Sequence, residues 1–230
     1  GPSGCQACNP NECEARRSPL IIDTQNWPPL VELSQPMESD DALKPGGVWF
    51  NIANQTDWLG SPTEQLISWP VNPAKDRFLV LPIQSGPNAG QILGINQLFG
   101  DQTVGPDGKT SANGFDALAK WADVTPEGTR KTVIERGDAI FSTLRVWADL
   151  NRNGKADAGE LATLDEVGIV RIDLLASTIQ GEDDYKNETR QRSVVETSPA
   201  SRWLASGEAD SGFRGIFDIW FRPIRTRIAK

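Results

Sequence analysis

One short segment, residues 149–160, constrains this chain more than any other part of it. Side-chain oxygens stand at its first, third, fifth, ninth and twelfth positions, carried by Asp149, Asn151, Asn153, Asp157 and Glu160. Gly154 holds the sixth position, where a sharp turn needs a positive φ. Lys155 at the seventh position offers its backbone carbonyl. Because calcium takes about six to eight oxygen ligands, this spacing predicts a calcium-binding loop of the EF-hand type.

The charges around this loop predict weak binding. Three carboxylates are present, and the cationic Arg152 and Lys155 lie among them. Since ligand charge tunes affinity, we expect a dissociation constant of about 10⁻⁵–10⁻³ M, which suits extracellular calcium. The only methionine, Met37, is far from the loop in sequence. The pattern therefore favours a structural calcium clamp over a sensor that opens a methionine-rich groove.

Composition excludes several classes of protein. A hydrophobic fraction of 38% with 23% charged residues is typical of a soluble globular domain. The net charge of −8 argues against nucleic acid as a partner. No apolar run approaches the ~20 residues of a membrane span. Histidine is absent, which excludes hydrolases that use histidine and metal sites that it ligates.

The three cysteines lie close together near the N-terminus, as Cys5, Cys8 and Cys13. A zinc knuckle would need a fourth ligand, and the chain has neither a fourth cysteine nor a histidine. A disulfide-bearing linker with one odd thiol is the favoured interpretation. Residues 1–17 also have almost no large apolar side chain, so we expect a linker there.

The remaining chain predicts an α+β fold, with antiparallel strands and short helices around the EF-hand-like loop. β-branched and aromatic runs predict strands at 18–23, 48–52, 65–69, 77–81, 169–174, 192–197 and 215–221. Apolar periodicity predicts short helices at 95–99, 114–123, 135–144 and 160–166. We expect one domain over residues 18–222, followed by a basic, solvated tail at 223–230. The cationic residues of this tail are Arg225, Arg227 and Lys230, and Arg222 lies just before it.

Several segments, taken in order, resemble a known bacterial family. They are residues 18–23, 48–50, 67–69, 78–81, 98–103, 112–118, 144–147, 149–164, 167–169 and 217–221. In these, the chain is similar to the secreted EF-hand-like calcium-binding domains related to the self-processing modules of RTX-type iron-regulated proteins. The resemblance implies an extracellular or cell-surface module of a larger bacterial protein. It also implies other protein domains or subunits as partners, with no nucleic acid and no membrane insertion.

Members of this family usually carry several calcium loops. Most of these have lost their acidic residues in this chain, which makes it a degenerate member with one intact loop. The segments after Ile22, Phe50 and Leu81 lack the required acidic residues. A second ion is an alternative near Asp123–Asp138. That segment begins like a calcium loop, with Asp123, Thr125, Glu127 and Gly128, and could close with Glu135 and Asp138. The competing interpretation is that Asp138 lies near the start of a helix, where its negative charge interacts favourably with the helix dipole.

The resemblance also bears on catalysis. The family cleaves itself at an Asp-Pro bond just before the first strand, using the aspartate carboxylate. Here the matching bond is Ser18-Pro19, so we expect no enzyme activity, with calcium-dependent self-processing or a toxin-associated module as the alternative.

A carbohydrate-binding module that uses loop tryptophans is a further alternative. Of the eight tryptophans, Trp27, Trp58 and Trp203 lie in polar loops, whereas core packing is the simpler interpretation for most of the others.

Overall fold

The computed structural model describes residues 15–24, 31–198 and 212–229. The expectations for Cys5, Cys8, Cys13, Trp27 and Trp203 fall outside these ranges. The described strands are β1 (Leu20–Asp23), β2 (Val48–Phe50), β3 (Thr63–Ile67), β4 (Asp76–Val80), β5 (Val133–Glu135), β6 (Arg145–Trp147), β7 (Leu161–Thr163), β8 (Ile169–Asp173), β9 (Ser177–Glu182), β10 (Glu188–Thr197), β11 (Phe213–Trp220) and β12 (Arg225–Ile228). The helical elements are the 3₁₀ turn η1 (Ile95–Gln97) and the helix α2 (Gly114–Ala119).

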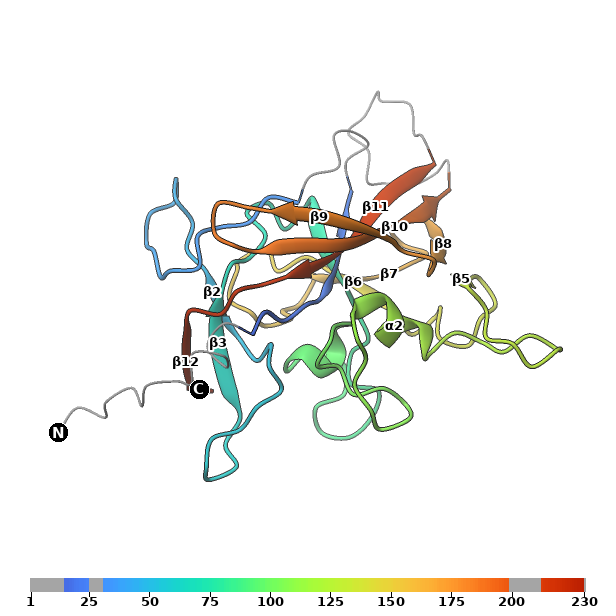
Figure 1. Cartoon of the computed structure of the whole chain (residues 1–230), viewed down its shortest axis with the longest axis horizontal. Coiled ribbons are helices and arrows are strands. Elements are labelled where there is room, and N and C mark those ends of the chain that lie inside the picture. The colour runs from blue at the N-terminus through green and yellow to red at the C-terminus, as the bar shows by residue number, and fades with distance from the viewer. Residues whose placement is uncertain (1–14, 25–30, 199–211, 230) are drawn as a thin grey trace.

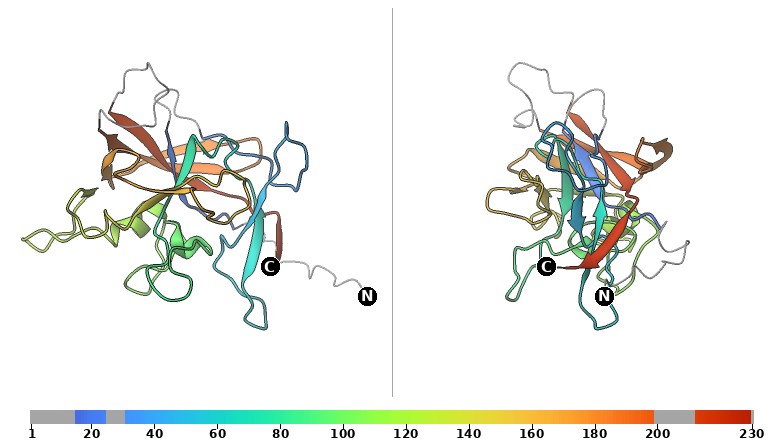
Figure 2. Two further views of the ribbon diagram at one scale, coloured as in Figure 1. Left: turned by 180° about the vertical axis from the view of Figure 1, so that it is seen from behind. Right: turned by 90° about the vertical axis from the view of Figure 1, so that its left-hand side faces the viewer.

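The strands form two antiparallel sheets. The large sheet has the order β5-β8-β10-β11-β1-β4-β6-β7, with β9 paired to β10. The small sheet has the order β12-β3-β2. Figures 1 and 2 show the large sheet curling, with the long strands β10 and β11 crossing over the shorter strands near β1. The first strand of the chain thus meets the last but one, since β1 pairs with β11 near the centre of the large sheet.

The large sheet is buried on both faces at β1, because this strand carries apolar residues at successive positions. Side chains along a strand alternate between the two faces. In β1, Leu20 and Ile22 join one hydrophobic cluster, and Ile21 between them joins the other. All three side chains are fully buried.

One face of the large sheet is covered by α2 and by the turns that follow β5. The apolar residues here include Phe115, Leu118, Phe141 and Leu144. α2 begins after Asn113, whose side chain accepts a hydrogen bond from the backbone N–H of Asp116. This is the N-cap arrangement that satisfies a free helical donor.

The other face is covered by the small sheet, which contributes to a cluster of four aromatic rings. Phe50, Trp69, Phe78 and Trp147 lie with ring centroids 4.6–6.0 Å apart. Trp69 and Trp147 are fully buried. The cluster joins the two sheets, since Phe50 comes from β2 whereas Phe78 and Trp147 come from β4 and β6.

The predicted α+β class is wrong, because the described residues are mostly β. Only one six-residue α-helix is present in them, and it overlaps the helix expected at 114–123. The helix expected at 135–144 is a series of turns that still buries Ile140, Phe141 and Leu144. Apolar spacing alone did not distinguish these turns from a helix. Within the described ranges, no helix is long and apolar enough to cross a membrane.

Residues 225–228 also differ from the expected solvated tail. Arg225–Ile228 form β12, which pairs with β3. The guanidinium of Arg227 lies 4.3 Å from the ring centroid of Trp49 and pairs with Glu64 at 2.9 Å. The basic residues of β12 therefore belong to the fold.

Candidate metal centre

The loop at residues 149–160 joins two neighbouring strands of the large sheet. β6 and β7 are antiparallel, with Trp147 opposite Leu161, and the Ala148 N–H donates to the Glu160 carbonyl at 3.0 Å. The loop is therefore the tip of a β-hairpin, and the helices expected on both sides of it are absent. The helix expected at 160–166 is replaced by β7 and a turn. Gly154 has a φ of 74°, as the sequence pattern requires.

The first residue of the loop is held from inside the core. Asp149 is fully buried, and its Oδ2 accepts hydrogen bonds from the Trp69 indole and the Gly154 N–H, both at 2.8 Å. Its Oδ1 accepts from the Asn153 N–H at 3.0 Å. These bonds fold the loop back over the Asp149 carboxylate.

The last residue of the loop is held in a similar way. Glu160 is buried, and its Oε1 accepts a hydrogen bond from the Leu150 N–H at 2.8 Å. Its Oε2 accepts from the Asp157 N–H at 3.0 Å and from the Trp147 indole at 3.4 Å. Both indole donors belong to the aromatic cluster, so that cluster positions both ends of the loop.

The three middle residues interact mainly with one another. The side-chain amides of Asn151 and Asn153 both donate to Asp157 Oδ2 at 2.7 Å. These hydrogen bonds lower the pKa of the Asp157 carboxyl. Asn153 Oδ1 accepts from the Lys155 N–H at 2.7 Å. The structure thus brings all six predicted residues into one loop, with the Asp157 carboxylate engaged by amide groups.

The electrostatics of the loop fit a cation. Burial raises the pKa of Asp149 to about 6, and the negative charge of Glu160 adds to this rise. A desolvated carboxylate with a second negative charge near it favours a bound positive charge. The part of the chain that the structure describes contains no group of three or more His, Cys, Asp or Glu arranged to hold a metal ion. The three carboxylates of the loop, Asp149, Asp157 and Glu160, are therefore not gathered into such a group, and the other donors of the pattern are two asparagines and a backbone carbonyl.

The second segment, near Asp123–Asp138, already contains a cation. The Lys131 ammonium lies 2.6 Å from Asp138 Oδ1 and 2.9 Å from Glu135 Oε1. Asp138 Oδ2 accepts from the Glu135 N–H at 2.8 Å, which closes a turn at the position where a helix start was expected. Glu127 lies in an exposed turn, where a hydrogen bond with Thr125 lowers the pKa of its carboxyl. The structure therefore brings together only part of the residues proposed for a second ion.

Of the loop tryptophans proposed for carbohydrate binding, Trp58 is described and its side chain is 89% exposed. Trp49 packs beside Arg227, and Trp220 lies under Arg190, whose guanidinium is 3.9 Å from the ring centroid. The described tryptophans thus serve mainly in packing.

The Ser18-Pro19 junction forms a second buried polar site. Ser18 is fully buried, its N–H donates to Asp101 Oδ1 at 2.9 Å, and its Oγ accepts from the Asp101 N–H at 3.3 Å. Arg17 pairs with the other carboxylate oxygen of Asp101 at 3.1 Å. The junction is therefore fixed by Asp101 on the side of the chain that leads into β1.

Asp218 of β11 lies beside the same junction and is fully buried. Its Oδ2 accepts from the Trp220 indole at 3.0 Å and from the Gly114 N–H at 3.3 Å. Its Oδ1 has no hydrogen-bond partner among the described residues. Burial raises the pKa of Asp218 to about 6, and the charge of Asp101 contributes to the rise. Sequence reasoning did not find this group, although a carboxylate inside the apolar run 216–221 was a signal for it.

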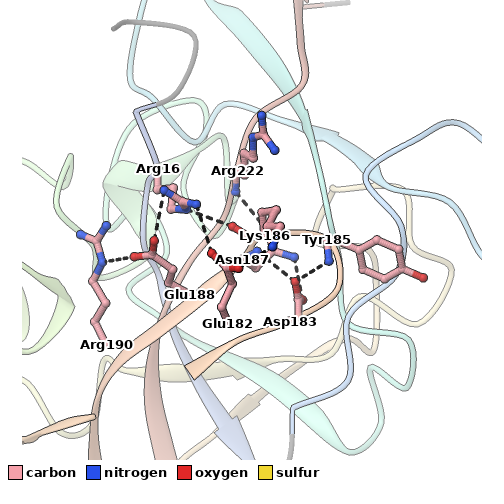
Figure 3. Close-up of polar contacts among 9 residues, drawn as sticks. All are labelled: Arg16, Glu182, Asp183, Tyr185, Lys186, Asn187, Glu188, Arg190 and Arg222. Carbon is pink, nitrogen blue, oxygen red and sulfur yellow. Dashed lines mark hydrogen bonds and ion pairs between the residues drawn. The ribbon is translucent and has the colours of Figure 1, made fainter. Parts of the chain in front are cut away.

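The segment before the junction is anchored to the turn between β9 and β10 (Figure 3). Arg16 pairs with Glu188 at 3.1 Å and with Glu182 at 3.6 Å, and donates to the Lys186 carbonyl at 3.0 Å. Asn187 in the same turn accepts from the Arg222 N–H at 3.1 Å. These contacts hold the segment before β1 and the segment after β11 to one hairpin.

Comparison with known proteins places this arrangement in a family. The SPM domain matches residues 50–205, a range that contains the whole 149–160 loop. The chain belongs to the SPM domain family. It is also 44% identical over 78 residues to the iron-regulated protein FrpA of Neisseria meningitidis serogroup C. This match covers 34% of the chain and 6% of FrpA. The relationship to iron-regulated RTX-type proteins is thereby confirmed.

Proposed function

We propose that this SPM domain is a calcium-binding structural module of a larger secreted or surface-assembled bacterial protein. The observation that carries the proposal is the hydrogen bonding of Asp149 and Glu160 to the indoles of Trp69 and Trp147. An ion at these carboxylates would be tied directly to the aromatic cluster between the two sheets. The similarity to FrpA, of which the match spans a small part, supports a module within a longer protein.

The calcium ligands in this proposal are the six residues of the loop pattern. Asp149, Asn151, Asn153, Asp157 and Glu160 would supply side-chain oxygens, and Lys155 its carbonyl. Calcium would supply the positive charge that the buried Asp149 and Glu160 carboxylates lack, and so fix the hairpin tip. At millimolar ion and the expected affinity, binding stabilises the fold by about 1–3 kcal/mol through mass action. We further propose secretion as the setting and other protein domains as the partners.

Calcium titration tests the proposal. We expect isothermal calorimetry to show one ion bound to the wild type with a dissociation constant of about 10⁻⁵–10⁻³ M. Calcium should also raise the melting temperature by several degrees over a chelator. Glu160→Gln removes one charge from the last ligand and should abolish both effects. Asp184→Asn removes an exposed charge outside the loop and should leave both intact. A wild type with no heat of binding and no calcium-dependent melting would contradict the proposal.

Self-processing is the alternative function that the related family suggests, and the Ser18-Pro19 junction is the bond at which it would occur. We propose that the domain does not cleave itself, because a seryl hydroxyl replaces the carboxylate that the related Asp-Pro chemistry uses. None of the chain's prolines follows an aspartate. Incubation of the wild type with millimolar calcium should give no fragment beginning at Pro19. Mass spectrometry of the product would detect such a fragment, and its appearance would show that the domain is an enzyme.

A further inference from the structure

The outer side of the calcium loop lies against the small sheet, although the loop belongs to the large one. The Arg152 guanidinium donates to the Gly46 carbonyl at 2.6 Å, just before β2. Gly154 packs so closely on β2 that an added Cβ would lie 2.8 Å from the Trp49 carbonyl and 2.9 Å from Val48 Cγ1. The central residues of the loop therefore contact the edge strand of the small sheet directly.

Trp49 continues this contact across the small sheet to β12. Its ring lies 4.3 Å from the Arg227 guanidinium and 5.6 Å from that of Arg225. Its indole N–H donates to Glu38 at 2.9 Å, and Glu38 also pairs with Arg225 at 3.3 Å. Thus β12, whose sheet partner is β3, also rests on a residue of β2 that touches the loop.

The two sheets differ in how extensively other parts of the protein pack against them. The large sheet has a hydrophobic cluster on each face of its centre, and its strand β1 is fully buried. The small sheet has three short strands, and a sheet of this size depends on packing against other elements for its stability. β12 is mostly exposed. Contacts from the calcium loop are therefore a larger share of the support for the small sheet than for the large one.

We propose that calcium in the 149–160 loop controls how firmly the small sheet docks on the large sheet, with Arg152 as the positioning residue that transmits the effect. This inference rests on the proposed calcium binding. An ordered loop holds Arg152 on the Gly46 carbonyl and Gly154 against β2. Loss of the ion frees these residues, so that β2 and β12 loosen while the centre of the large sheet stays folded. Exposure of β12 and its arginines then depends on calcium.

Hydrogen exchange measured by mass spectrometry tests this coupling. In the wild type, calcium should slow the exchange of amides in 46–50 and 225–228 at least about tenfold relative to a chelator. The amides of 214–219, in the large sheet, should change much less. Arg152→Gly removes the guanidinium and suits the positive φ of 57° at this position. This variant should still bind calcium in calorimetry but lose most of the slowing in 46–50 and 225–228.

Lys109→Ala is the control, since it removes an exposed positive charge outside the loop and keeps the bond from Arg152 to Gly46. It should behave as the wild type. Calcium binding with unchanged exchange in β2 and β12 would overturn the inference and leave the proposed function standing. Full slowing in Arg152→Gly would also overturn it. Absence of any heat of binding in the wild type would instead remove the proposed function, on which the inference depends.

Discussion

Gly100→Ala is expected to lower the free energy of unfolding by about 3 kcal/mol or more. An added Cβ at this position would lie 1.6 Å from the Ser18 carbonyl oxygen, far inside van der Waals contact. The Ser18 backbone has little room to move, because its N–H is bonded to Asp101 and the next strand residue, Leu20, donates to the Phe99 carbonyl at 3.0 Å. Overpacking of a rigid site typically costs about 1–3 kcal/mol, and backbone contact places this case at or above the upper end.

Thermal melts measure the effect of this substitution. For a domain of this length, such a loss lowers the melting temperature by about 10 °C. Gly181→Ala is the matched control, since the nearest atom to its added Cβ is 3.8 Å away, at ordinary contact distance. It should leave the melting temperature within a few degrees of the wild type. A Gly100→Ala variant as stable as this control would mean that the junction is not tightly enclosed.

The strands of the large sheet were mostly predictable because their apolar runs are continuous and lie between turn residues. The runs at 18–23 and 215–221 contain β1 and most of β11, and their pairing requires contact between the two ends of the chain. The helical expectations failed where apolar residues three and four apart come from successive turns. Ile140 and Leu144 show this, since both are buried without an α-helix between them.

The 149–160 loop could be singled out from sequence as a candidate calcium site because its pattern is local and every constrained position lies within twelve residues. Its supporting contacts could not. Trp69 reaches Asp149 from 80 residues away, and Arg152 bonds to a carbonyl 106 residues earlier. Such pairs depend on the packing of the two sheets, which the order of short strands does not determine. The Ser18 site has the same origin, since Asp101 and Asp218 meet there only in the folded chain.

Asp218→Asn is expected to stabilise the domain at neutral pH, and by an amount that depends on pH. Burial raises the pKa of Asp218 from 3.8 to about 6 in the folded state, so the folded protein holds this proton more tightly than the unfolded chain does. Below about pH 4 the carboxyl is neutral in both the folded and the unfolded state, so its burial does not desolvate a charge. As the pH rises from about 4 to 6, the wild type loses about 2–3 kcal/mol of stability through this group, and the loss is complete above it.

Asparagine removes this loss because its amide is never charged. Its oxygen can accept the hydrogen bonds from Trp220 and Gly114, whereas its NH₂ group, in the place of the unpartnered Oδ1, brings buried donors whose desolvation offsets part of the gain. We therefore expect Asp218→Asn to melt a few degrees above the wild type at pH 7.5, and at or below it at pH 4. Asp184→Asn, at an exposed position, should match the wild type at both pH values. A difference between Asp218→Asn and wild type that is the same at pH 4 and 7.5 would show that the ionisation of Asp218 is not its cause. A less stable variant at pH 7.5 would show that the charged carboxylate contributes to holding the Ser18 junction, since the hydrogen bonds lost with the charge would then outweigh its desolvation.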